Sequence, residues 1–226
     1  MMLARALILV FVSASFVSAQ DSFKVEAAKI ASPEALAASI RGAMTAEGAR
    51  VLDAEGKLFA EIWLRKGIPV SAKPGAGAGA VQFPVLAEGE LLGAIKFIAE
   101  GHDYRDQAIA PGTYTIRYGL QPVNGDHLGV SSYRDYALLV PAEKDDSLEP
   151  LDRKKLQAKS AEAAGSSHPA VMMLLAATSS TKTAPAIIRD EEKNTWSVVL
   201  ALPPVLKGEP VPSPLLVQLV ISGMAM

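Results

Sequence analysis

Apolar and polar residues alternate in several short segments of the chain, and the clearest of these follows Pro111-Gly112. Over residues 113–120, tyrosine, isoleucine and leucine occupy one face and threonine and arginine the other, which predicts a half-buried strand. A loop rich in turn-forming residues follows at 121–132. Residues 133–140 predict a second strand, covered on both faces at its end because apolar residues point both ways.

Similar patterns predict further strands and two hairpins, which turn at residues 53–57 and 189–194. The run 169–177 is apolar throughout, so it fits either a buried strand or the continuation of a helix, and periodicity does not distinguish them. The remaining predicted strands are residues 51–52, 58–64, 91–98, 186–188, 195–202 and 215–221.

Two short helices are predicted beside the strands. Residues 20–31 are expected to be a leader or edge segment. Ser32-Pro33-Glu34 has the order of a helix start and Gly48 is placed to end that helix, so 20–47 is expected to be an N-terminal segment that contains one short helix. Residues 147–165 predict an inserted surface helix with a thin apolar stripe, closed by Gly165. Many short strands and two weak helices favour a mainly β fold: an antiparallel β-sandwich with one short N-terminal helix and one surface helix.

Residues 1–19 have the features of a cleaved signal peptide. Arg5 precedes an almost wholly apolar run, and Val17-Ser18-Ala19 matches a small-residue cleavage site. The apolar run is shorter than the roughly 20 residues that span a bilayer, so an uncleaved anchor is the weaker alternative, and no later segment is long enough to span. We expect export to the periplasm or the extracellular space, with residues 20–226 forming a single domain.

The composition narrows the chemistry that is open to the chain. Without cysteine there is no disulfide framework, thiolate metal site or thiol nucleophile. The 22 basic and 24 acidic residues nearly balance, and the basic run Arg153-Lys154-Lys155 is flanked by acids, so no nucleic-acid partner is expected. No Gly-x-Ser-x-Gly motif presents a nucleophilic serine. A binding protein is therefore expected rather than an enzyme.

All three histidines lie in loop-forming sequence beside glycine, aspartate or proline. Loops at one end of a sandwich converge, so His102, His127 and His168, with Asp103 or Asp126, are candidate ligands of a divalent metal. Their spacing follows no known ligand pattern, and solvated loop histidines are the simpler interpretation.

The triplet Tyr104-Arg105-Asp106 recurs as Tyr133-Arg134-Asp135, on the other side of the strand predicted at 113–120. One hypothesis is that Arg105 and Arg134 present their guanidinium groups to an anionic ligand or partner. The alternative, which we favour, is that each arginine pairs with a nearby acid and holds a loop to its strand while the tyrosines pack.

Residues 111–135 also carry a resemblance. Pro111-Gly112-Thr113-Tyr114 is similar to the Pro-Gly-x-Tyr start of a late strand in many extracellular β-sandwich domains. The longer run, in which this start continues as Thr-Ile-Arg-Tyr-Gly-Leu-Gln-Pro and is followed by Asp126-His127-x-Gly129 and Tyr133-Arg134-Asp135, resembles exported bacterial β-sandwich proteins of unknown function. The resemblance implies an exported sandwich and assigns no catalytic residue.

Three functional hypotheses follow. The first is a non-enzymatic exported module that binds an unknown small ligand or an envelope protein through the loop 124–133, with Asp126, His127, Arg134 and Arg105 as candidate contacts. The second is a metal-binding protein or metal-dependent enzyme that uses the three histidines. The third is a structural component of a larger envelope assembly.

Overall fold

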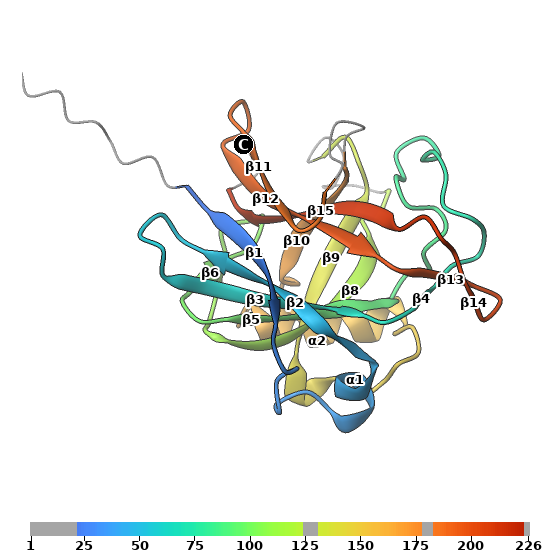
Figure 1. Ribbon diagram of the computed structural model, residues 1–226, viewed down its shortest axis with the longest axis horizontal. Helices are drawn as coiled ribbons and strands as arrows, with labels where there is room; N and C mark the ends of the chain where they lie inside the picture. Colours follow the sequence, from blue (N-terminus) through green and yellow to red (C-terminus); the bar gives the residue numbers. More distant parts are fainter. Residues whose placement is uncertain (1–21, 124–130, 178–182, 224–226) are drawn as a thin grey trace, which may run out of the picture.

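The computed structural model describes residues 22–123, 131–177 and 183–223, and its main element is one sheet of ten strands (Figure 1). Every neighbouring pair in this sheet is antiparallel. In order across the sheet, the strands are β1 (Lys24–Lys29), β2 (Met44–Leu52), β3 (Leu58–Arg65), β5 (Leu91–Phe97), β8 (Gly112–Leu120), β9 (Asp135–Pro141), β10 (Val171–Ala176), β15 (Leu215–Ser222), β12 (Thr195–Leu202) and β11 (Ala186–Asp190).

Short elements complete the fold. Strand β4 (Ile68–Pro69) pairs in parallel with β13 (Pro204–Leu206), which forms a hairpin with β14 (Glu209–Pro210). Strands β6 (Gly101–His102) and β7 (Ala108–Ile109) form a second hairpin. The helices are α1 (Ala38–Ala43), the 3-10 turn η2 (Ala142–Lys144) and α2 (Arg153–Ala163). No helix in the described parts of the chain is long and apolar enough to cross a membrane.

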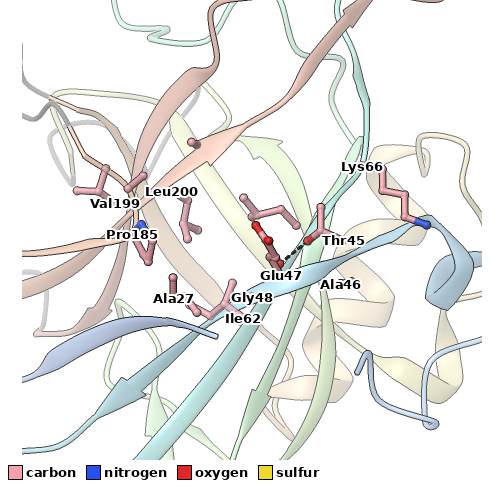
Figure 2. Close-up of a pocket in the computed structure, with 14 residues that line it drawn as sticks. Ala27, Thr45, Ala46, Glu47, Gly48, Ile62, Lys66, Pro185, Val199 and Leu200 are labelled. Atoms are coloured by element: carbon pink, nitrogen blue, oxygen red, sulfur yellow. Dashed lines mark hydrogen bonds between the residues drawn. The ribbon is translucent and has the colours of Figure 1, made fainter. Parts of the chain in front are cut away.

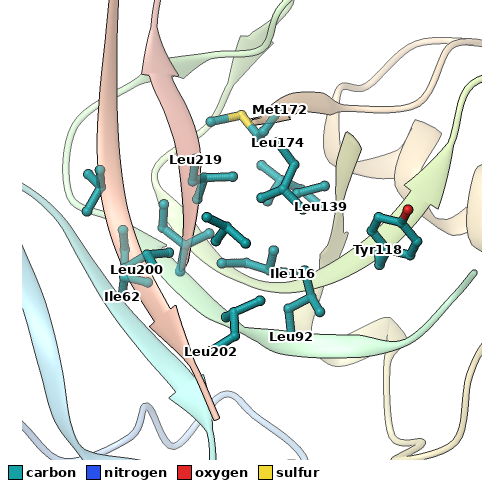
Figure 3. Packing of buried hydrophobic residues seen from close by; sticks show 14 of the residues in the cluster. Ile62, Leu92, Ile116, Tyr118, Leu139, Met172, Leu174, Leu200, Leu202 and Leu219 are labelled. Atoms are coloured by element: carbon teal, nitrogen blue, oxygen red, sulfur yellow. The ribbon is translucent and has the colours of Figure 1, made fainter. Parts of the chain in front are cut away.

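The ten-stranded sheet curls until its two halves face each other across one hydrophobic core. In Figure 1, β11, β12 and β15 lie across from β2, β3 and β5. The inward side chains of both halves interdigitate, as Figure 3 shows for Ile62, Ile116 and Leu219 among others. The predicted mainly β, antiparallel fold with two helices is therefore confirmed, and its two layers belong to one continuous sheet.

The edges of this sheet meet at a seam, which we define as the boundary between β1 and β11. The two strands are in contact, but among the described residues no ladder of backbone hydrogen bonds joins them. Aromatic side chains bridge one end of the seam: the Phe23 ring lies 5.2 Å from that of Phe59 and 5.9 Å from that of Trp196, between centroids. Arg189 of β11 lies over Trp196, with its Cζ 4.9 Å from the ring centroid. Edge-on ring contacts of this kind contribute about 0.5–1.5 kcal/mol each.

The predicted N-terminal helix is shorter than expected, whereas an edge strand lies within residues 20–31, which were expected to form a leader or edge segment. Residues 24–29 form the edge strand β1, helix α1 spans only six residues, and Met44 already begins β2. The predicted helix end at Gly48 is wrong, because this residue pairs with Trp63 of β3. A Cβ atom at Gly48 would lie 2.6 Å from the Ile62 carbonyl oxygen, so glycine is present for a close approach of two strands.

The second predicted helix is present as α2, within the predicted range 147–165. Asp152 caps it by accepting a hydrogen bond from the Lys155 backbone amide, and Gly165 closes it with a positive φ of 58°. The helix packs on β9 through the fully buried side chain of Leu156. The apolar run 169–177, which fitted a strand or a helix, forms strand β10 between β9 and β15.

The expectation that residues 113–120 form a half-buried strand is wrong, because β8 is covered on both faces. Thr115 and Arg117, on the face away from the main core, are both 0% exposed. The connection from η2 to α2 crosses this outer face and buries them. Strand β9 is buried along its whole length, which fits its prediction of cover on both faces.

The close approach of β3 and β5 gives a test of the strand packing. A Cβ atom at Gly93 would lie 2.2 Å from the Trp63 carbonyl oxygen, so Gly93→Ala forces two central strands apart. We expect it to lower the free energy of unfolding by about 2 kcal/mol or more, measured by urea denaturation. Gly42→Ala in α1 meets no atom within 4 Å and is expected to stabilise by about 0.5–1 kcal/mol. Equal effects of the two substitutions would contradict this packing.

Candidate functional site

Two of the three candidate histidine ligands lie within the described residues. His102 is exposed on β6, with its Nε2 atom 3.9 Å from Glu100 Oε1, and His168 is exposed between α2 and β10. His127 and Asp126 lie outside the described residues. Among the residues that are described, no three His, Asp or Glu side chains come together as a metal site would require.

The loops that carry His102 and His168 are nevertheless joined. The Gln107 side-chain amide donates to the Pro169 carbonyl at 3.1 Å and accepts from Ser166 Oγ at 2.6 Å. Asp103 accepts a hydrogen bond from the Val171 backbone amide at 3.0 Å. These contacts hold the connection between β6 and β7 against the connection that leads into β10.

Asp103, the candidate metal ligand beside His102, is already fully engaged. It is 1% exposed and accepts hydrogen bonds from the backbone amides of Arg105 and Gln107 at 2.8 and 2.9 Å. It also accepts from the Gln107 side chain at 2.8 Å, in addition to the bond from Val171. A carboxylate with four donors organises a loop and has little capacity left for a metal.

The two Tyr-Arg-Asp triplets occupy different environments. Arg105 is exposed, whereas Arg134 donates from Nε to the Gln121 carbonyl at 2.8 Å and so ties the start of β9 to the end of β8. Its bond goes to a backbone carbonyl and not to the nearby acid that the favoured interpretation named. Tyr104 packs against Tyr136, with 6.4 Å between ring centroids.

Asp135, the acid of the second triplet, is a buried anchor. Its carboxylate accepts hydrogen bonds from the backbone amides of Gln82 and Phe83 at 2.8 and 3.0 Å and from the Tyr118 hydroxyl at 2.7 Å. Burial, together with this bond to Asp135, raises the pKa of Tyr118 far above its usual value. Burial also raises the pKa of Tyr136 to about 12. Both hydroxyls therefore stay protonated at neutral pH and serve as donors.

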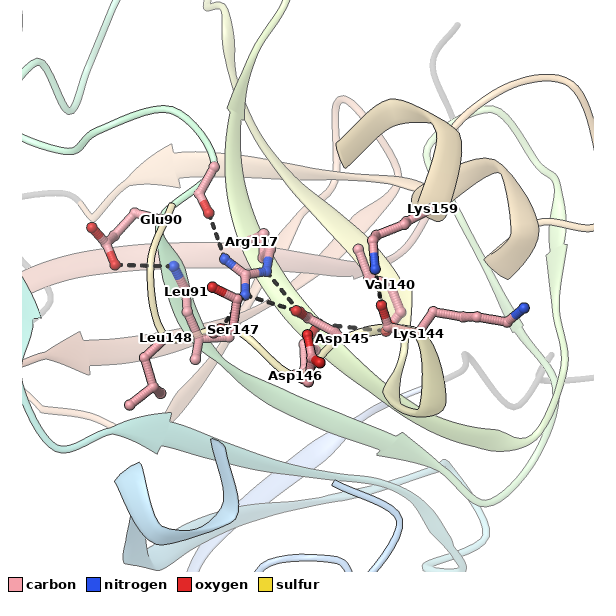
Figure 4. Close-up of polar contacts among 12 residues, drawn as sticks. Glu90, Leu91, Arg117, Val140, Lys144, Asp145, Asp146, Ser147, Leu148 and Lys159 are labelled. Carbon is pink, nitrogen blue, oxygen red and sulfur yellow. Dashed lines mark hydrogen bonds and ion pairs between the residues drawn. The ribbon is translucent and has the colours of Figure 1, made fainter. Parts of the chain in front are cut away.

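Arg117 forms the most extensive buried polar network (Figure 4). Its Nε and Nη2 atoms donate to the two carboxylate oxygens of Asp145 at 2.6 and 2.8 Å. The three remaining donors bind the backbone carbonyls of Gly89, Ser147 and Glu149 at 2.7, 2.5 and 3.0 Å. All five N–H groups are thus satisfied, which leaves the guanidinium no donor for a ligand.

Glu90 lies beside this network and is also buried. Arg65 donates to its Oε1 atom at 2.5 Å, and the Leu91 backbone amide donates to the same oxygen at 3.2 Å. Burial nonetheless raises the pKa of Glu90 above its ordinary value, because desolvation outweighs the attraction of Arg65. The carboxyl therefore takes up a proton at a higher pH than a solvated glutamate.

Neither Arg117 nor Asp145 was a candidate from the sequence. The only signal for Arg117 is a charged residue in the middle of a strand whose other members are apolar, aromatic or threonine. Asp145 lies 28 residues further along the chain, within a charged connection where it looks like any solvated acid.

A pocket of about 540 Å³, which we call the seam pocket, lies beside the seam (Figure 2). Strands β1, β2 and β3 line one side, and the two residues before β11 with the second half of β12 line the other. This places the pocket at the end of the seam opposite the Phe23–Trp196 contact. Its walls are mainly apolar and include Ile62, Leu64, Pro185, Val199 and Leu200.

Two charged side chains border the seam pocket. Lys66 donates from Nζ to the Gly42 carbonyl of α1 at 2.8 Å, which uses one of its three N–H groups and holds the ammonium group toward α1. The carboxylate of Glu47 is exposed and has no hydrogen-bonded or ion-paired partner among the described residues. A second hollow of about 420 Å³ lies between the start of β8 and the end of α2, but its Glu162 already pairs with Lys144 at 3.0 Å.

Comparison of the chain with protein-family models, with curated proteins and with solved structures finds no match. The functional argument therefore depends on the geometry of this chain alone.

The Arg117 network predicts a large and specific loss of stability. Arg117→Met leaves Asp145 buried without its cation and removes three donors from backbone carbonyls, so we expect a loss of about 3–5 kcal/mol in urea unfolding. The control Arg50→Met breaks a pair with Glu61 in which the arginine side chain is 42% exposed, and it should change stability by less than about 1 kcal/mol. Similar losses of unfolding free energy in both variants would show that the buried Arg117 network stabilises the protein no more than the more exposed Arg50–Glu61 pair.

Proposed function

We propose that the chain is an exported binding module, without a catalytic role, that holds a small and mainly apolar ligand in the seam pocket. The observation that carries this proposal is the pocket of about 540 Å³ between the two edges of the sheet. Its size lies within the roughly 300–1,000 Å³ that small-molecule sites occupy, and such sites are mostly apolar with a few polar groups. Export is proposed from the signal-like residues 1–19 and from the resemblance to exported bacterial proteins.

The position of the pocket supports ligand entry. It lies beside β1 and β11, which are neighbours in space but which no ladder of backbone hydrogen bonds joins within the described residues. Small movements of β1 relative to β11 therefore break no row of backbone hydrogen bonds. Separating any other neighbouring pair of strands in the sheet would break such a row.

The buried polar residues support binding rather than catalysis. Asp103, Asp135 and Arg117 each use their donors or acceptors within the protein, mostly on backbone groups. The loop 124–133, expected to bind a ligand or an envelope protein, lies mostly outside the described residues, and its role stays a prediction.

A metal site remains a second candidate because of one observation. The loops that carry His102 and His168 are held together by Gln107 and Asp103, so two of the three histidines come from joined segments. His127 would have to supply the third ligand of such a site.

Blocking the seam pocket tests the leading proposal. Octan-1-ol is a suitable probe because it offers an apolar chain and one hydroxyl, and its binding to the purified protein is measurable by titration calorimetry. Ala27 lines the pocket from an exposed position on β1, so Ala27→Phe fills the mouth without altering the core. We expect this variant to bind octan-1-ol at least about tenfold more weakly than the wild type.

The matched control is Ala158→Phe, which adds the same ring at an exposed alanine of α2 that does not line the pocket. It should bind octan-1-ol like the wild type. Absence of binding to the wild type, or unchanged binding to Ala27→Phe, would reject the seam pocket as the ligand site.

Metal analysis of the purified protein tests the second candidate. If the histidines form a site, the protein will contain about one zinc or copper ion per chain, and His127→Ala will lose it. A protein without stoichiometric metal, or a His127→Ala variant that retains it, removes this candidate.

A further inference from the structure

We infer that Glu47 makes the seam pocket selective for ligands with a positively charged head, such as an amine or a guanidinium group on an apolar body. This inference rests on the proposed function, because it concerns the ligand of the same pocket. It is carried by the conformation of β2 at the pocket, by the charges around the mouth and by the apolar walls behind it.

A bulge in β2 brings Glu47 to the pocket. Met44 pairs with Arg65, but the next pair is Gly48 with Trp63, so three residues of β2 lie opposite a single residue of β3. Thr45 Oγ1 donates to the Glu47 carbonyl at 2.6 Å and stabilises the bulge from within (Figure 2). Bulges redirect side chains out of the regular alternation of a strand, and they are enriched beside binding sites.

The bulge is also fixed from both sides. The Ile30 backbone amide donates to the Ala46 carbonyl at 3.2 Å, and the Lys66 amide donates to the Ala43 carbonyl at 2.9 Å. On the far side of the bulge, the close approach of Gly48 to Ile62 sets the register. Glu47 therefore stands at a defined place on the rim and not on a freely moving loop.

Glu47 is the acidic side chain among the residues that line the pocket. Lys66 is bound to the Gly42 carbonyl, and in Figure 2 its nitrogen lies toward α1. Lys29 lies opposite Glu47 in the β1–β2 ladder but makes no ion pair with it. The carboxylate of Glu47 is thus the charged group at the rim with no partner in the described structure, and a carboxylate can only accept hydrogen bonds.

The apolar walls of the seam pocket contact the apolar body of the ligand. Leu200 of β12 and Ile62 of β3 belong to the same core cluster, and Leu64 and Val199 also line the pocket, so an alkyl or aryl body meets apolar side chains from both halves of the sheet. A cationic head at the rim can then reach Glu47 while it stays partly in water. An ion pair at such a half-exposed place is worth a few-fold in affinity, which is enough to select among ligands with the same apolar body.

Three probes with the same eight-carbon chain test this inference: octylammonium, octan-1-ol and octanoate. Each is titrated into the purified wild-type protein and into Glu47→Gln and Glu55→Gln. Glu55 lies in the exposed turn between β2 and β3, so its variant has the same change in net charge at a distance from the pocket. We expect the wild type and Glu55→Gln to bind octylammonium about fivefold more tightly than octan-1-ol, with octanoate weakest.

The Glu47→Gln variant is expected to bind octylammonium and octan-1-ol equally, and raised salt should reduce the preference of the wild type. Equal binding of the two probes to the wild type, or a preference that survives in Glu47→Gln, would overturn the role of Glu47 while pocket binding still stands. If none of the probes binds, or if all still bind to Ala27→Phe, the proposed function falls and this inference falls with it.

Discussion

Side-chain contacts close the ten-stranded sheet across the seam between β1 and β11, because no backbone ladder joins these two strands in the described part of the chain. Phe23 supplies the contact at one end by packing against Phe59 and Trp196, which belong to opposite halves of the sheet. Unpaired strand edges invite pairing with other chains, and charged residues on an edge oppose this. Strand β1 follows this rule, since Lys24, Glu26 and Lys29 are all exposed on it.

Buried charged residues hold the connections in a chain that has no cysteine. Asp103 binds its own loop to β10, Asp135 binds residues 82–83 to β9, and Arg117 binds residues 145–149 to β8. In each case at least one partner is a backbone group from a segment distant in sequence. A polar group buried with all its partners specifies one arrangement, because any other arrangement leaves it unsatisfied at a cost of about 1–3 kcal/mol.

Local patterns in the sequence were sufficient for most strands, because alternation reports which face of a strand meets a core. These local patterns were misleading where a second layer covers the other face of a strand. Strand β8 was predicted to be half-buried, because no residue near Arg117 in the sequence indicates that the segment with Asp145 covers it. They failed again at Gly48, where pairing with β3 overrides a local helix-ending signal.

The candidate site shows the same limit. The sequence identified histidines and arginines by their chemistry, and the structure joins the loops of His102 and His168. The sequence did not indicate the seam pocket. Its walls come from β1–β3 and from β12 with the residues just before β11, which lie more than a hundred residues apart and carry mainly ordinary apolar side chains. A pocket between the two edges of a sheet forms only when the sheet curls and brings those edges together. Local sequence patterns do not predict which edges will meet.

The two ends of the seam have different roles in the stability of the sheet. The aromatic contact holds one end, so the other end can keep a cavity without the sheet coming apart. A molecule that touches both Leu64 and Leu200 adds cross-seam contacts at the place where the ladder is missing. Binding of this kind stabilises the folded state in proportion to ligand concentration and affinity. A bound ligand would thus join the two edges of the sheet where no backbone hydrogen bonds are described between them. The function proposed for the pocket is in this way linked to the stability of the whole sheet.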